Sequence, residues 1–163
     1  MILKNFLNTG KGECDMRKLT AVNGLEVKKL EVGSYPASPM AMWVRLEYED
    51  GEQDILTFNL GNYQVGYGPE TGPFASFIQT ATSYLAELPQ YMIDWIYENG
   101  IAEPYCKFGQ PVSADFLYES YPLFSFNEDL LRELDPIGYR AYEQAWNEEC
   151  FKQQKQLRQH LYG

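Results

Sequence analysis

Residues 40–60, with the sequence MAMWVRLEYEDGEQDILTFNL, decide the fold of this chain. In the first half the apolar side chains of Met42, Val44, Leu46 and Tyr48 alternate with Trp43, Arg45 and Glu47, and in the second half Leu56, Phe58 and Leu60 alternate with Ile55, Thr57 and Asn59. A period of two places one set of side chains on the buried face of a strand and the other set on its outer face. The acidic segment Glu49-Asp50-Gly51-Glu52 lies between the two halves and is typical of a turn. The stretch therefore predicts an antiparallel β-hairpin.

More strands and loops are expected around this hairpin. Asn23-Gly24 is the signal of a tight turn, which predicts a hairpin between residues 19–22 and 25–32. Two prolines make residues 33–39 a loop that interrupts strand pairing. The other expected elements are a glycine-rich loop over 61–73, a strand over 74–78 and a strand region over 116–126.

A central helix is expected next. Pro89 suits the first turn of a helix that extends to about Glu98. Asn99-Gly100 then supplies a left-handed cap that ends the helix, with Ile101 folding back on the last turn. Pro104 prevents the helix from restarting. The segment is therefore a corner of the chain.

Two further helices are predicted towards the C-terminus. Asn127 can cap a short helix over 128–134, and Asp135-Pro136 is a strong start for a long last helix. The apolar stripe expected on one face of the long helix consists of Ile137, Ala141 or Tyr142, Ala145 or Trp146, Cys150, Leu157 and Leu161. Beyond Phe151 the sequence is rich in Lys and Gln, so we expect the final turns to project.

These elements predict a single α+β domain over residues 16–163. Its mainly antiparallel sheet has about four to six strands in the N-terminal and middle parts, packed by a central helix and a long C-terminal helix. Residues 1–15 are a separate question. Lys11-Gly12-Glu13, just before Met16, is how a purine-rich ribosome-binding sequence translates in frame. We hypothesise that the native start is Met16 and that residues 1–15 are a non-native upstream extension.

The compartment follows from what the sequence lacks. No apolar run approaches the ~20 residues that a membrane helix needs, and the N-terminal segment does not resemble a secretory signal. The three cysteines, Cys14, Cys106 and Cys150, are widely spaced and form no CxxC pair. That spacing indicates neither a disulfide framework nor a zinc site. We expect a cytoplasmic protein without a membrane partner.

The residue types needed for catalysis are sparse. His160, the only histidine, lies near the chain end, where it cannot hold a general base steadily. Asp94 and Glu98 share a helix face, but acids at this spacing are ordinary on solvated helices. The glycines of residues 66–72 do not form a phosphate-binding motif. We therefore predict no catalytic residues, no metal ligands and no cofactor, and that the protein is not an enzyme.

Charge is distributed unevenly along the chain. Residues 46–106 contain ten acidic and no basic side chains, which equals the net charge of −10 for all 163 residues. A negative field repels nucleic acid and anionic membranes and attracts basic partners. We therefore expect no direct nucleic-acid binding, and a protein partner with a basic surface, encoded by the host or by the same genetic element.

The order of three segments resembles a known group. DILTFNL (54–60), IDWIYENGIAEP (93–104) and YESYPLFSF (118–126) are similar to the LTVNL, ENGLAEP and YPLYxF patterns of a domain-of-unknown-function family. That family comprises short proteins from plasmids, conjugative elements and prophages of gut bacteria. The resemblance covers roughly residues 40–126 and implies a mobile-element accessory protein. The chain departs from the family pattern between Phe74 and Pro89.

Three functions remain open at this point. The first is a non-catalytic accessory that binds a protein, such as an anti-CRISPR or other anti-defence inhibitor that occupies a basic nucleic-acid-binding site. Its expected contact residues are Glu49, Asp50, Glu52, Asp54, Tyr63, Tyr67 and Glu70. The second is a structural or oligomerising module that dimerises through the C-terminal helix. The third is an enzyme with a carboxylate-only site, which would require two acids to converge in a cleft.

Overall fold

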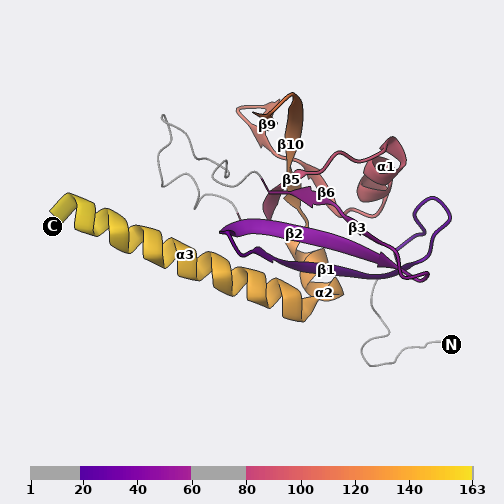
Figure 1. Cartoon of the computed structure of the whole chain (residues 1–163), viewed down its shortest axis with the longest axis horizontal. Coiled ribbons are helices and arrows are strands. Elements are labelled where there is room, and N and C mark those ends of the chain that lie inside the picture. The colour runs from indigo at the N-terminus through magenta and orange to yellow at the C-terminus, as the bar shows by residue number, and fades with distance from the viewer. Residues whose placement is uncertain (1–18, 60–79, 163) are drawn as a thin grey trace.

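The computed structural model describes residues 19–59 and 80–162, and its architecture is α+β, as predicted (Figure 1). Antiparallel sheets combine with helices, of which the last is by far the longest. The helices are α1 (Gln90–Glu98), α2 (Glu128–Leu134) and α3 (Pro136–Tyr162). The strands are β1 (Val27–Tyr35), β2 (Ser38–Tyr48), β3 (Gln53–Ile55), β4 (Thr57–Phe58), β5 (Thr82–Leu85), β6 (Ala102–Pro104), β7 (Cys106–Lys107), β8 (Gln110–Pro111), β9 (Ser113–Phe116) and β10 (Glu119–Phe126).

The first sheet has the strand order β1-β2-β3 and contains the predicted hairpin. Strand β2 pairs antiparallel with β1 on one side and with β3 on the other. The alternation along β2 is confirmed from Met42 to Tyr48, because the even-numbered side chains are buried and Trp43, Arg45 and Glu47 are partly exposed. The inner face of the sheet is formed by Leu30, Val32, Met42, Val44, Leu46 and Tyr48.

The tight turn at Asn23-Gly24 is confirmed, with positive φ at both residues, but the predictions of a long hairpin around it and of a loop over residues 33–39 are wrong. Val22 and Leu25 form only an isolated bridge around the Asn23-Gly24 turn, and the long partner of β1 is β2. The loop predicted over residues 33–39 shrinks to Pro36 and Ala37, the only residues between the two strands. Burial of a continuous apolar face by nine- and eleven-residue strands outweighs the strand-breaking effect expected of Pro36 and Pro39.

The chain changes sheets at Leu56, where a single strand over residues 53–60 was expected. The Leu56 N–H donates to the Val44 carbonyl at 2.8 Å, and the Leu56 carbonyl accepts from Ala86 N–H at 2.9 Å. One residue therefore links both sheets and divides the predicted strand into β3 and β4. Its side chain is fully buried between them.

The second sheet has the order β4-β5-β10-β6, with β9 paired to β10. The predicted strand region over 116–126 is largely β10, while its first residues belong to β9 and a turn. Strand β5 was not predicted, because all four of its residues are buried and the segment shows no alternation. The predicted loop over 61–73, the strand over 74–78 and residues 1–15 lie outside the described residues.

The predicted helix ends are confirmed. At the end of α1, Gly100 has φ +65°, its N–H donates to Tyr97 and the Ile101 N–H donates to Ile96 at 3.0 Å. These two bonds form a Schellman motif. At the start of α2, the Asn127 side chain accepts from Leu130 N–H at 3.2 Å.

Asp135 joins the start of α3 to the edge of the first sheet. One carboxylate oxygen accepts from Gly138 N–H at 3.1 Å, and the other accepts from Val32 N–H at 2.9 Å. A Cβ at Gly138 would overlap the Val32 carbonyl and the Asp135 carboxylate. Glycine therefore allows helix and strand to touch.

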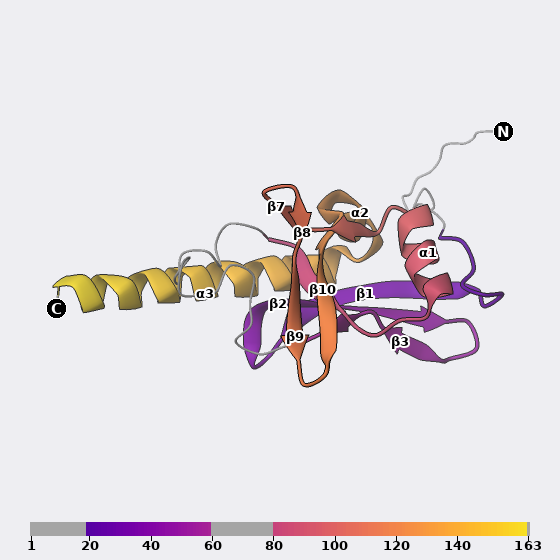
Figure 2. The same cartoon turned by 90° about the horizontal axis from the view of Figure 1, so that it is seen from above.

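The core lies between the two sheets and is closed by the helices. From α3 it receives Tyr139, Tyr142 and Trp146, and the Tyr142 hydroxyl accepts from Ala81 N–H at 2.8 Å. The predicted stripe on α3 is only partly right, because Ile137 at one end and Leu161 at the other are exposed. Figures 1 and 2 show the C-terminal half of α3 projecting beyond the sheets, as its composition predicted.

Candidate functional site

The turn between β2 and β3 brings four of the predicted contact residues together. The exposed side chains at this acidic turn are Glu49, Asp50, Glu52 and Asp54. The other predicted contacts, Tyr63, Tyr67 and Glu70, lie outside the described residues. The acidic turn is therefore the described part of the predicted site.

Local hydrogen bonds hold the acidic turn in one conformation. Gly51 has φ +93°, a conformation that other residues rarely adopt, and its N–H donates to the Tyr48 carbonyl at 2.9 Å. The Asp50 carboxylate accepts from Glu52 N–H at 2.9 Å. The Tyr48 hydroxyl donates to Asp54 at 2.7 Å. Burial raises the pKa of Tyr48, and its hydrogen bond to the Asp54 carboxylate raises it further. The carboxylates are thus presented on a preorganised backbone.

On the outer face of the same sheet the acidic side chains form ion pairs. Arg45 pairs with Glu31, and Lys29 lies 3.6 Å from the Glu47 carboxylate. The hydrogen bond from Arg45 lowers the pKa of Glu31. Within residues 19–59 and 80–162, the four carboxylates of the acidic turn form no such ion pair. Negative charge on this sheet is neutralised on its face and left uncompensated at its tip.

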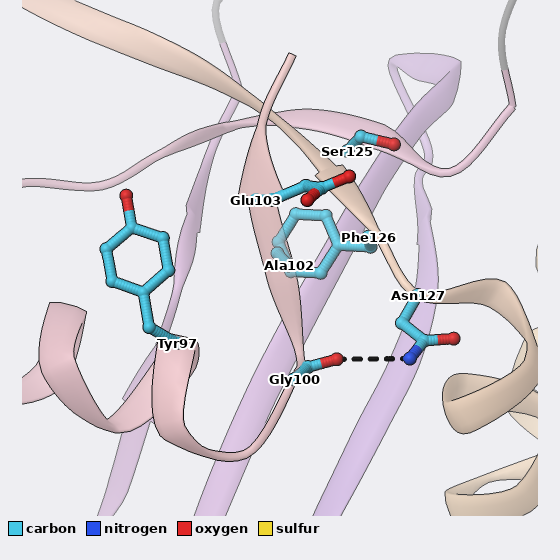
Figure 3. Close-up of a pocket in the computed structure, with 7 residues that line it drawn as sticks. All are labelled: Tyr97, Gly100, Ala102, Glu103, Ser125, Phe126 and Asn127. Carbon is cyan, nitrogen blue, oxygen red and sulfur yellow. Dashed lines mark hydrogen bonds between the residues drawn. The ribbon is translucent and has the colours of Figure 1, made fainter.

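A hollow of about 350 Å³ lies beside the end of α1, over the paired residues of β6 and β10 (Figure 3). Asn127 donates to the Gly100 carbonyl at 3.1 Å across its base. Its lining consists of Tyr97, Gly100, Ala102, Glu103, Ser125, Phe126 and Asn127. Among these described lining residues Glu103 is the only carboxylate, so the hollow does not supply the acid pair that a carboxylate-only enzyme requires.

Two carboxylates do meet elsewhere, beyond the end of β5. Glu119 shares a hydrogen bond with Glu87 and repels its charge, and both effects raise the pKa of Glu87. Both side chains are exposed. Acids in contact with water are poorly suited to hold a substrate between them, so this pair contributes to the surface charge.

The turn between β9 and β10 was not identified from the sequence. Leu117 is 81% exposed with φ +58°, and Tyr118 is 100% exposed. Leucine is uncommon in the left-handed region of backbone conformation. An exposed leucine with this conformation is rarer still. The sequence contains no turn signal here, because a turn usually contains a residue such as Gly or Asn and this one consists of Leu117 and Tyr118.

The β7–β8 turn also has an exposed apolar residue with positive φ, but this residue lies beside a lysine. Phe108 is 93% exposed with φ +54°, and the Lys107 ammonium lies 5.9 Å from its ring. Figure 2 shows the β7–β8 and β9–β10 hairpins extending towards opposite sides of the second sheet. The two apolar tips are therefore separate surfaces.

The structure assigns no metal site to the described ranges 19–59 and 80–162, where no group of three His, Cys, Asp or Glu side chains could hold an ion. Burial raises the pKa of the Cys150 thiol, which is half-buried on α3. Among the helices that the structure describes, none is long and apolar enough to cross a membrane.

Comparisons of the chain with models of protein families, with curated proteins and with solved structures found no match.

Proposed function

We propose that this chain is a non-catalytic accessory protein of a mobile element and that it binds a protein with a basic surface through the acidic turn. The observation that carries the proposal is the contrast within the first sheet. Acids on the sheet face are paired with Lys29 and Arg45, whereas the acids at its tip form no ion pair in the described structure. Uncompensated charge on a rigid turn is available to an incoming cation.

The resemblance to mobile-element proteins supports a particular kind of partner. A host-defence nuclease, such as a CRISPR effector, binds nucleic acid in a channel lined by Lys and Arg. Carboxylates can replace phosphates as partners of these side chains, because both are anionic acceptors of charge-assisted hydrogen bonds. A protein that fills such a channel acts as an anti-defence inhibitor without any chemistry of its own.

The test is affinity capture from a lysate of the cell that carries the element, at two salt concentrations. The variant is Asp50→Asn/Glu52→Gln/Asp54→Asn, in which the oxygens that accept from Glu52 N–H and the Tyr48 hydroxyl remain. We expect the captured protein to be lost from the variant and weakened by salt for the native chain.

The matched control removes the same charge elsewhere. Glu98→Gln/Glu133→Gln/Glu148→Gln changes three exposed acids on the helices and should keep the captured protein. Retention by the turn variant at both salt concentrations would refute the acidic-turn contact. Purified captured protein should also bind nucleic acid less well in the presence of the native chain.

A second function, oligomerisation through α3, is favoured by the projecting half of that helix. Phe151 is 69% exposed and Leu161 61% exposed, while Lys152, Lys155 and Arg158 make this segment basic. Its charge complements the acidic turn of another copy. Light scattering should then detect a dimer that dissociates in the Phe151→Ser variant, and a monomer at high concentration would exclude this function.

A further inference from the structure

The residues of the turn between β9 and β10 have no structural role that explains their presence there. A left-handed backbone at the first turn position favours Gly, Asn or Asp, yet Leu117 occupies it with φ +58°. The Leu117 and Tyr118 side chains gain nothing from burial, since they are 81% and 100% exposed. Backbone conformation disfavours Leu117 and exposure disfavours both residues, so a role outside the fold is the simplest reason for their presence.

The stem of this hairpin is a small apolar core of its own. Tyr121 stacks on Phe58 with ring centroids 4.3 Å apart and planes 5° apart. Phe116 tilts against the same Phe58 ring at 6.1 Å. Tyr84 and Leu123 complete the buried cluster beneath them. The tip is therefore carried by packed aromatic rings, which reduces the entropy lost when it docks.

Acids flank the apolar tip. Asp115 precedes it on β9, Glu119 follows it on β10, and Glu87 contacts Glu119 from the end of β5. All three are exposed. An apolar centre with a charged rim is the arrangement of a protein-binding hot spot, in which Tyr is among the commonest anchors.

We propose that Leu117 and Tyr118 form a docking anchor that inserts into an apolar pocket of a partner protein whose rim carries Lys or Arg. The acid rim makes nucleic acid and anionic membrane unsuitable occupants, because both would be repelled. The inference rests on the proposed function and deepens it, since the same basic partner receives a second, apolar contact away from the acidic turn. The acidic turn attracts the partner, and the anchor holds it.

We expect that the anchor can be removed without weakening the fold, because both side chains are exposed. Leu117→Asn/Tyr118→Ser puts a residue that tolerates the left-handed backbone at position 117 and deletes exposed apolar surface. Phe108→Asn is the matched control, because Phe108 also has positive φ and near-complete exposure but lies beside Lys107. Both variants should melt no lower than the native chain, so a loss of binding cannot be ascribed to unfolding.

The experiment uses the full chain with a photo-crosslinking phenylalanine at position 118 or at position 108, in the same lysate. We expect a discrete crosslinked protein from position 118 and none from position 108. Its crosslinked peptide should contain apolar residues close to Lys or Arg in the partner's sequence. Isothermal calorimetry with that purified protein should show affinity reduced about tenfold or more by Leu117→Asn/Tyr118→Ser and unchanged by Phe108→Asn.

The outcomes separate the anchor from the proposed function. If the acidic-turn variant loses binding while Leu117→Asn/Tyr118→Ser binds like the native chain, the anchor is refuted and the proposed function stands. If neither variant changes the affinity, both are refuted. A crosslink from position 118 to a second copy of this chain, or to a partner peptide without basic residues, also overturns the anchor.

Discussion

The β2–β3 turn and the β9–β10 turn both connect antiparallel strands, but only the first is built from the residue types that such turns favour. In the first, Gly51 takes the positive φ, polar side chains face water and hydrogen bonds close the turn. In the second, Leu117 takes the positive φ, and it and Tyr118 are exposed to water. The preferences of turn residues explain the backbone of the β2–β3 turn, and they do not explain why Leu117 and Tyr118 occupy the β9–β10 turn.

The same contrast separates two ways in which a surface can be prepared for a partner. At the acidic turn the backbone is unstrained and hydrogen-bonded, and only the charge of the carboxylates is uncompensated. A binding role there would therefore reduce the free energy of unfolding little. At the β9–β10 turn the fold itself carries a local cost, which a binding role would justify. Mutations should therefore affect stability in opposite directions at the two turns.

The largest expected effect is alkaline unfolding, which involves Tyr48 beneath the acidic turn. Burial raises the pKa of Tyr48, Tyr139 and Tyr142 above the ordinary value of 10.0. Their contribution to stability is therefore present below pH 10.0 and is lost as pH rises towards the raised pKa values. We expect cooperative unfolding with simultaneous tyrosine ionisation, followed by circular dichroism and ultraviolet absorbance. Tyrosines that ionise at their ordinary pKa without unfolding would contradict this.

The next effect concerns the framework that both turns share. Gly138→Ala places a Cβ against the Val32 carbonyl and the Asp135 carboxylate, and so separates α3 from β1. We expect a loss of about 2–3 kcal/mol in the free energy of unfolding, measured by urea denaturation. Ala141→Ser, an exposed change one turn further along α3, serves as the control and should alter stability little.

A smaller loss is expected at the acidic turn. Gly51→Ala forces a side chain into φ +93°, where open space surrounds the new Cβ but the backbone is strained. The free energy of unfolding should fall by about 1 kcal/mol. If thermal melting shows no loss, the first turn is less constrained than its hydrogen bonds indicate.

The smallest effect has the opposite sign. Leu117→Gly should raise the free energy of unfolding by about 0.5–1 kcal/mol, because glycine accepts the positive φ that leucine resists. Denaturant titration against the native chain measures this gain. A destabilised Leu117→Gly variant would show that the side chain stabilises the fold, and the comparison between the turns would fail.

Prediction from the sequence succeeded where the cause is local. The Asn99-Gly100 stop, the Asn127 cap and the start of α3 at Asp135-Pro136 depend on residues within one helical turn, and all are confirmed. The alternation along β2 is equally local. Of the predicted contacts, the four acids of the β2–β3 turn lie together because they are neighbours in the sequence.

Prediction failed where distant segments compete for the same backbone. Leu56 changes sheets because Val44 and Ala86 both offer it a hydrogen-bond partner, and neither is visible from its neighbours. Strand β5 shows no alternation because both of its faces are covered. The β9–β10 turn was missed because its residues contradict turn preferences.

The sequence by itself determined the α+β class, the helix ends and the acidic composition of the β2–β3 turn, since each depends on short-range backbone preferences and counted charges. Only the tertiary structure decided which acids are neutralised. Register places Lys29 opposite Glu47 and Arg45 opposite Glu31, while the carboxylates of the turn form no ion pair with any cation of the described residues. The tertiary structure also decided that Leu117 and Tyr118 are exposed. The stem of their hairpin packs with Phe58 and Tyr84 from β4 and β5, and the two tip residues are not part of that cluster.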